Sequence, residues 1–293
     1  MNKKPFIQQA WLRALLFIVI AFPMAIAIGF GIDIVLNGLY AYDYATGSIP
    51  IAQFLKQYAT GNIGFIIIIL VFVYWIDKRT LLSLGFVWKG FQTDAITGLA
   101  VSMAILFIGS SILVITQNLY ITNAIFSLQQ FLIAIALYIL VAFNEEIIFR
   151  GYLLSNLLKS MNRWWALIIV SVLFALLHSQ NQHINTISFI NIFLGGILLG
   201  INYVYTKNLW FSIFFHFGWN FFQGSVLGYN ISGTGIEQGS SLMQQTTLGS
   251  AYLTGGNFGF EGSILCTVLI PLMIIVLFVH YNRKEKKLRN GIV

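Results

Sequence analysis

Eight long apolar segments recur along this chain of 293 residues, and they restrict its possible folds more than any other feature. A helix needs about 20 predominantly apolar residues to cross the hydrocarbon core of a bilayer. The segments cover residues 10–36, 62–76, 95–116, 124–156, 164–178, 186–204, 209–226 and 262–281. Only 9% of the residues are charged, against about 25% in soluble domains. The sequence therefore predicts an all-α, polytopic integral membrane bundle of about eight transmembrane helices, forming a single domain over residues 1–293.

The basic residues predict how these helices are oriented. They gather in every second connection between the apolar segments, and only Lys56 and Arg150 depart from this pattern. Cytoplasmic connections of membrane proteins are enriched in Lys and Arg, so we expect both termini in the cytoplasm. The polar loop of residues 227–261 then lies outside and is predicted to be flexible. The net charge of +7 does not indicate nucleic-acid binding, because the basic residues flank apolar segments instead of forming a stripe with aromatic platforms.

Three charged residues interrupt the fourth apolar segment. Glu145, Glu146 and Arg150 lie within it, although a charge in the middle of a membrane helix costs roughly 2.5–3.5 kcal/mol. Glu145 and Glu146 point about 100° apart on a helix, and Arg150 follows Glu146 by one turn. We therefore expect an ion pair between Glu146 and Arg150 that leaves Glu145 free to face a cavity as a general base. The alternative is a salt bridge that only stabilises the helix.

Two histidines lie in or at the end of other apolar segments, each with a defined neighbour one turn away. His178 ends the fifth segment and shares a helix face with Phe174, whereas His216 shares a face of the seventh with Asn220. Measured from the basic ends of their helices, Glu145 and His178 lie about 20 and 22 Å deep, and His216 about 13 Å. A tilted or displaced seventh helix is therefore needed to bring the three together.

The three motifs together resemble a known family. Glu-Glu-x-x-x-Arg at 145–150, Phe-x-x-x-His at 174–178 and His-x-x-x-Asn at 216–220 are similar to those of the CAAX-protease and bacteriocin-processing (CPBP, or Abi) family of intramembrane endopeptidases. The family's catalytic core would cover approximately residues 124–226. The stretches 193–196, 208–210, 219–221 and 259–263 resemble the bacterial branch, which implies a bacterial plasma-membrane protein.

The resemblance implies hydrolysis of a peptide bond in a membrane-associated protein or peptide. Glu145 and His178 would activate the attacking water, and His216 and Asn220 would hold the oxyanion, with Glu146 and Arg150 in support. In a metal-dependent alternative, Glu145, His178 and His216 would bind a divalent metal such as zinc. We favour a site without a cofactor, because Asn is a poor zinc ligand and the sequence lacks a His-Glu-x-x-His pair.

Two other classes of function compete with this interpretation. A non-enzymatic immunity or regulatory protein could bind a peptide in the same cavity, and a proton-coupled transporter could relay protons through the same side chains. Transporters often carry an internal duplication, which this sequence lacks. The sequence leaves open the substrate and whether it is prenylated, the side from which it reaches the site, and the oligomeric state.

Three further predictions concern single polar or small residues. Asp94 follows Thr93 and is predicted to cap the helix of the third segment. Gly196 and Gly200 form a Gly-x-x-x-Gly pair that predicts close helix packing. Glu261 has two possible roles: it could cap the last helix or shape the site.

Overall fold

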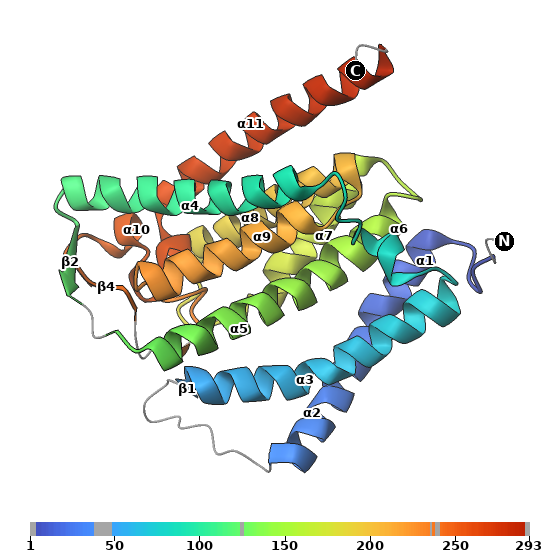
Figure 1. Cartoon of the computed structure of the whole chain (residues 1–293), viewed down its shortest axis with the longest axis horizontal. Coiled ribbons are helices and arrows are strands. Elements are labelled where there is room, and N and C mark those ends of the chain that lie inside the picture. The colour runs from blue at the N-terminus through green and yellow to red at the C-terminus, as the bar shows by residue number, and fades with distance from the viewer. Residues whose placement is uncertain (1–3, 38–48, 124–125, 235, 238–240, 291–293) are drawn as a thin grey trace.

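The computed structural model describes residues 4–37, 49–123, 126–234, 236–237 and 241–290, which form a bundle of helices (Figure 1). Lys3, and residues 124–125 at the start of the predicted core, lie outside the described residues. Within the described residues, each of the eight predicted apolar segments is mostly helical. The α-helices are α1 (Ala10–Leu16), α2 (Phe22–Asn37), α3 (Ile51–Val71), α4 (Gln92–Ile115), α5 (Leu128–Glu146), α6 (Ser155–Leu157), α7 (Arg163–Leu177), α8 (Thr186–Thr206), α9 (Trp210–Asn220), α10 (Ala251–Thr254) and α11 (Ile264–Arg289).

In the part of the chain that the structure describes, four π-helical turns lengthen these helices. Two of the turns join successive α-helices, and the other two extend the ends of α3 and α9. The turns are Phe17–Ala21, Phe72–Ile76, Ile147–Leu154 and Phe221–Val226. Within the described residues, six continuous helices are long and apolar enough to cross a membrane, while the helix Arg163–Leu177 is apolar but shorter. The prediction of an all-α, polytopic membrane bundle is confirmed, and the count of eight spans stays a prediction.

The helix of the second span extends beyond its apolar segment, which starts at residue 62. Helix α3 begins at Ile51, eleven residues earlier. Gln57, Tyr58 and Asn62 lower the hydropathy of this half of the helix, but they line a cavity inside the protein. A polar face turned toward a cavity is compatible with a membrane helix, because it does not contact lipid.

Two pairs of short strands join connections at one end of the bundle. Strand β1 (Ile49–Pro50) pairs in parallel with β3 (Ile236–Glu237), and β2 (Leu119–Asn123) pairs antiparallel with β4 (Met243–Thr247). The described part of the loop 227–261 therefore contains β3, β4, α10 and two 3₁₀ turns instead of being uniformly irregular. All these strands belong to connections that the charge pattern predicted to lie on one side.

The basic connections meet at the opposite end. The backbone N–H of Trp11 donates to Ser160 Oγ at 2.9 Å, and Arg163 Nη2 pairs with Glu285 Oε2 at 3.2 Å. The described N- and C-terminal regions therefore share one end of the bundle. The predicted alternation of connections is present in the fold, while the assignment of the basic end to the cytoplasm stays a prediction.

Small residues let the helices approach closely. Helix α3 packs on α5, α5 on α9, and α9 on α4. A Cβ atom at Gly98 of α4 would lie 2.3 Å from the carbonyl oxygen of Phe211 in α9. The predicted packing role of Gly196 and Gly200 is confirmed, because a Cβ at either position would press on α7, at 3.0 Å from Ser171 in the first case. Such contacts supply the van der Waals attraction that holds membrane helices together.

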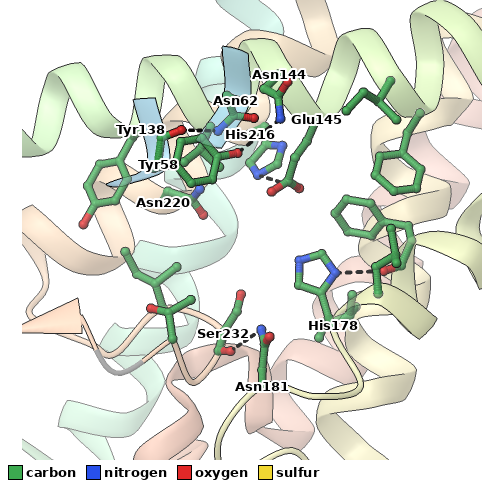
Figure 2. Close-up of a pocket in the computed structure, with 18 of the residues that line it drawn as sticks. Tyr58, Asn62, Tyr138, Asn144, Glu145, His178, Asn181, His216, Asn220 and Ser232 are labelled. Carbon is green, nitrogen blue, oxygen red and sulfur yellow. Dashed lines mark hydrogen bonds and ion pairs between the residues drawn. The ribbon is translucent and has the colours of Figure 1, made fainter. Parts of the chain in front are cut away.

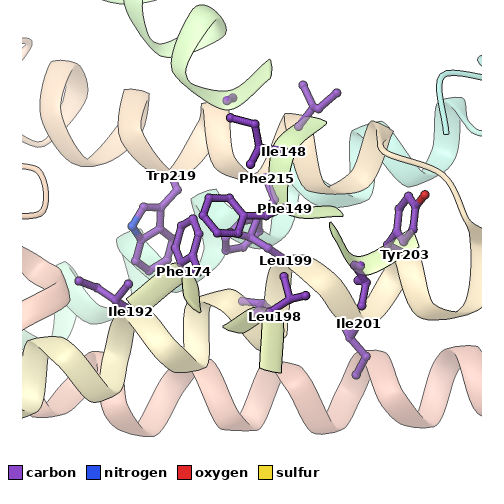
Figure 3. Close-up of a cluster of buried hydrophobic side chains, with 14 of the residues drawn as sticks. Ile148, Phe149, Phe174, Ile192, Leu198, Leu199, Ile201, Tyr203, Phe215 and Trp219 are labelled. Atoms are coloured by element: carbon purple, nitrogen blue, oxygen red, sulfur yellow. The ribbon is translucent and has the colours of Figure 1, made fainter. Parts of the chain in front are cut away.

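A cluster of buried aromatic and aliphatic side chains lies between α7, α8, α9 and the π-helical segment Ile147–Leu154 (Figure 3). Phe149, Phe174, Leu199 and Phe215 belong to this cluster and also line the cavity described below. One wall of the cavity is thus part of the packed core. Close packing fixes the rotamers of its side chains.

Asp94 does not cap α4, contrary to the prediction, because the N-cap position is Phe91. Asp94 lies in the first turn of the helix and is buried. Its Oδ1 accepts hydrogen bonds from Asn202 Nδ2 at 2.7 Å and from the Tyr281 hydroxyl at 3.0 Å. The carboxylate therefore joins α4, α8 and α11.

Candidate active site

The four predicted catalytic residues line one cavity of about 560 Å³ (Figure 2). Glu145 comes from α5, His178 from the end of α7, and His216 and Asn220 from α9. Helices α2 and α3 also line the cavity, and most of the lining is apolar. A mostly apolar cavity with a few convergent polar groups is the usual form of a binding or active site.

The two adjacent glutamates face different surroundings. Glu145 points into the cavity with 21% of its side chain exposed, whereas the side chain of Glu146 is 0% exposed. Helix α5 ends at Glu146, and the π-helical segment Ile147–Leu154 follows directly. Such π-helical turns occur frequently at functional sites. The separation of the two glutamates agrees with their predicted difference of about 100° in direction.

Glu146 lies at the centre of a buried ionic cluster. Its Oε1 accepts hydrogen bonds from Arg150 Nη1 and from His216 Nδ1, both at 2.8 Å. Arg150 Nη2 donates to the carbonyl oxygen of Gly196 at 3.0 Å. The predicted ion pair between Glu146 and Arg150 is confirmed. Because both charges are fully buried, each depends on the other for compensation.

His216 reaches the level of Glu145 despite its shallower position in the sequence. Its Nε2 lies 4.0 Å from Glu145 Oε2. The expected difference in depth disappears because the connection before α9 is itself buried: Asn208 is 2% exposed and Leu209 is 0% exposed. The Leu209 N–H donates to the carbonyl of Gly85 at 2.9 Å, so α9 begins below the basic end of the bundle.

His178 lies across the cavity from Glu145 (Figure 2). Its Nδ1 is 2.8 Å from the backbone carbonyl oxygen of Phe174, and the two rings lie 4.6 Å apart between centroids. A carbonyl can only accept, so Nδ1 carries the proton and Nε2 of the neutral ring is free to accept one. The four-residue spacing in Phe-x-x-x-His therefore fixes the tautomer as well as the position of the ring. Asn220 lines the same cavity one turn after His216 and is 6% exposed.

Helix α3 contributes polar side chains that the sequence did not assign to the site. Tyr58 and Asn62 line the cavity, and Asn144 Nδ2 lies 3.5 Å from the Tyr58 hydroxyl. Figure 2 shows the Tyr58 hydroxyl on the side of the cavity that holds Glu145 and His216. The four-residue spacing of Tyr58 and Asn62 would place both on one helix face, which is the signal that could have identified them.

Glu261 shapes the site and does not cap α11, whose N-cap is Ser263. Glu261 Oε1 accepts from the indole Nε1 of Trp219 at 2.8 Å, and Oε2 accepts from the backbone N–H of Ser232 at 2.8 Å and from its hydroxyl. Both donors belong to residues that line the cavity. Glu261 therefore fixes part of the cavity wall, which includes the described start of the loop after α9.

The metal-dependent alternative requires Glu145, His178 and His216 to converge on one ion. Among the residues that the structure describes, no group of three His, Cys, Asp or Glu side chains is placed to hold a metal ion. As they stand, the three side chains do not fit a zinc site, whose ligand atoms lie about 2.0–2.2 Å from the metal.

The fold and the cavity define a multi-pass membrane protein that gathers carboxylate, imidazole and amide side chains from separate helices. Residues 127–222, about one third of the chain, match the family of Rce1-like type II CAAX prenyl endopeptidases. The match supports the assignment of this segment to the CPBP family of membrane proteases, which the three motifs predicted, and the segment contains all six predicted catalytic and supporting residues. No curated protein matches the chain. The bacterial branch stays a prediction.

Proposed function

We propose that the protein is an intramembrane endopeptidase of the glutamic type, which hydrolyses a peptide bond in a membrane-associated protein or peptide. One observation carries this proposal: Glu145 and His216 lie 4.0 Å apart in a cavity that His178 and Asn220 also line. A base for water and donors for an oxyanion are the two requirements of peptide hydrolysis, and both kinds of group face this cavity.

Glu145 and His178 would activate the water. A water molecule between the Glu145 carboxylate and Nε2 of His178 can give its proton to Glu145 as the oxygen attacks the peptide carbonyl. Glu145 then returns this proton to the leaving amine, so the products are a carboxylic acid and an amine. A well-placed general base contributes roughly 10²–10⁴-fold to the rate.

His216 and Asn220 would stabilise the oxyanion of the tetrahedral intermediate. The Asn220 amide can donate directly. Because His216 Nδ1 already donates to Glu146, His216 can donate from Nε2 only as an imidazolium. That cation would balance the cluster, since two carboxylates, Glu145 and Glu146, then face two positive charges, His216 and Arg150. Removal of one oxyanion donor typically lowers the rate about 10²–10³-fold.

The test compares cells that produce the native chain, Glu145→Gln, or the control Glu285→Gln. Glu285 is a matched control because its carboxylate pairs with Arg163 at the basic end and does not line the cavity. We expect a peptide fragment in the membrane proteome or the medium that is present with the native chain and the control and absent with Glu145→Gln.

Protein amounts in the membrane fraction must be equal for the comparison to count. If every fragment persists with Glu145→Gln, the proposed mechanism is wrong. A non-enzymatic immunity or regulatory protein would instead retain its phenotype in Glu145→Gln, because glutamine preserves the shape of the cavity.

A further inference from the structure

The cavity lies toward one end of the bundle, and the charge pattern indicates on which side of the membrane that end lies. The basic connections meet at one end of the bundle and the β-paired connections at the other. If the positive-inside rule holds, the end that carries the β-strands is extracytoplasmic. The side from which a substrate reaches Glu145 then depends on which end the cavity approaches.

The cavity is lined only by the non-basic end and the middle of the helices. Asn181, Ser232, Thr234 and Glu261 line it, and all four belong to connections at the β-paired end. None of the described residues that line it comes from the basic connections, which span residues 77–91, 158–162 and 207–209.

A second buried ionic cluster lies at the opposite end of the bundle. Asp77 is 5% exposed and pairs with Arg13 Nε at 3.3 Å and Arg79 Nε at 2.9 Å. It also accepts hydrogen bonds from the Tyr152 hydroxyl and from Asn156 Nδ2. These contacts tie α1, α6 and the ends of two π-helical turns together. The helices are thus joined at the basic end, from whose connections no described residue lines the cavity.

Part of the cavity lining is also exposed on the outer surface of the bundle. Ile26 and Phe30 of α2 and Leu177 at the end of α7 line the cavity, yet they are 51%, 62% and 49% exposed. Counted along the chain, Phe30 lies nearer the β-paired end of its helix than the basic end. Apolar side chains that face both lipid and cavity would let an apolar peptide segment pass sideways without exposing its backbone to water.

We propose that the site is open to the extracytoplasmic side and to the outer half of the bilayer, and closed to the cytoplasm. The substrate class would then be exported peptides, or segments of membrane proteins at or near the outer surface. This choice of substrate class rests on the proposed endopeptidase function, whereas the direction of the cavity does not.

Cysteine labelling in intact cells tests the direction without requiring catalysis. The native Cys266 is fully buried and would first be replaced by alanine. Three single-cysteine variants then report position: Gln57→Cys in the cavity, His183→Cys on the exposed connection after α7, and Lys287→Cys at the basic end. The probe is a charged maleimide that does not cross membranes.

We expect the Gln57→Cys and His183→Cys variants to react in intact cells, and the Lys287→Cys variant to react only after permeabilisation. Reaction of Lys287→Cys in intact cells would overturn the proposal. So would a Gln57→Cys variant that reacts only after permeabilisation, or that stays unlabelled in both conditions while His183→Cys reacts. Each of these results leaves the endopeptidase proposal standing, because Glu145→Gln tests that proposal separately.

Discussion

Loss of one member of the buried ion pair between Glu146 and Arg150 is expected to lower the stability of the protein substantially. Both side chains are 0% exposed, and Arg150 Nη1 lies 2.8 Å from Glu146 Oε1. Arg150→Met would leave the Glu146 charge buried without its guanidinium partner, and Glu146→Gln would do the converse. Breaking a buried pair in this way costs about 3–5 kcal/mol.

The double variant Glu146→Gln/Arg150→Met should lose less stability than the sum of the two single variants. It buries no uncompensated charge from this pair, so we expect a coupling energy of about 2–3 kcal/mol, which is the upper part of the range for residues in contact. Glutamine is chosen because its amide oxygen can still accept from His216 Nδ1, which limits the change to the charge.

The assay is denaturant unfolding of the purified protein in detergent micelles, followed by tryptophan fluorescence. The control is the pair Arg163 and Glu285, whose side chains are 33% and 28% exposed. A partly exposed pair should show a coupling of less than about 1 kcal/mol. If the effects of Glu146→Gln and Arg150→Met are simply additive, Glu146 does not provide the charge that Arg150 needs, and the reasoning fails.

Three other predictions can be tested on the same purified protein. Gly64→Ala should separate α2 from α3 and lower stability by about 1–3 kcal/mol, because its Cβ would lie 2.0 Å from the Ala25 carbonyl oxygen; the matched change Gly61→Ala meets nothing within 4 Å and should not destabilise. Glu261→Gln leaves a single acceptor oxygen for the donor groups that now bind the carboxylate. We therefore expect a loss of stability of about 1–3 kcal/mol and a raised KM, measured by unfolding and kinetics. Unchanged stability and KM would contradict the role of Glu261 in the cavity wall. Chelators should leave cleavage unchanged, and a loss that zinc restores would support the metal-dependent alternative.

The membrane class and the site motifs were predictable because both depend on local patterns. Apolar runs predicted the long helices of the bundle, since the requirement to satisfy backbone polar groups in lipid leaves few other choices. The spacing of Glu146 and Arg150 predicted their ion pair, and the four-residue spacing of Phe174 and His178 put them on one face. These inferences need only the geometry of a single helix.

Other features depend on contacts between distant parts of the chain. Helix α3 begins eleven residues before its apolar segment, and the polar residues of this part face a cavity, which hydropathy alone does not reveal. Asp94 joins Asn202 and Tyr281, which lie more than a hundred residues away. The two possible roles of Glu261 could be separated only once Trp219 and Ser232 were seen to bind its carboxylate.

The sequence by itself determined that this protein is a bundle of membrane helices with ionisable groups in its interior. Membrane helices need long apolar segments, and charged side chains within them are too costly to face lipid. Only the tertiary structure decided that Glu145, His178, His216 and Asn220 share one cavity, and that α2 and α3 also line it. The physical reason is that the direction of a side chain around its helix follows from local geometry, whereas the depth and partner of each helix follow from packing against the others. The connection before α9 illustrates this, because Asn208 and Leu209 are buried by other parts of the chain and His216 lies 4.0 Å from Glu145.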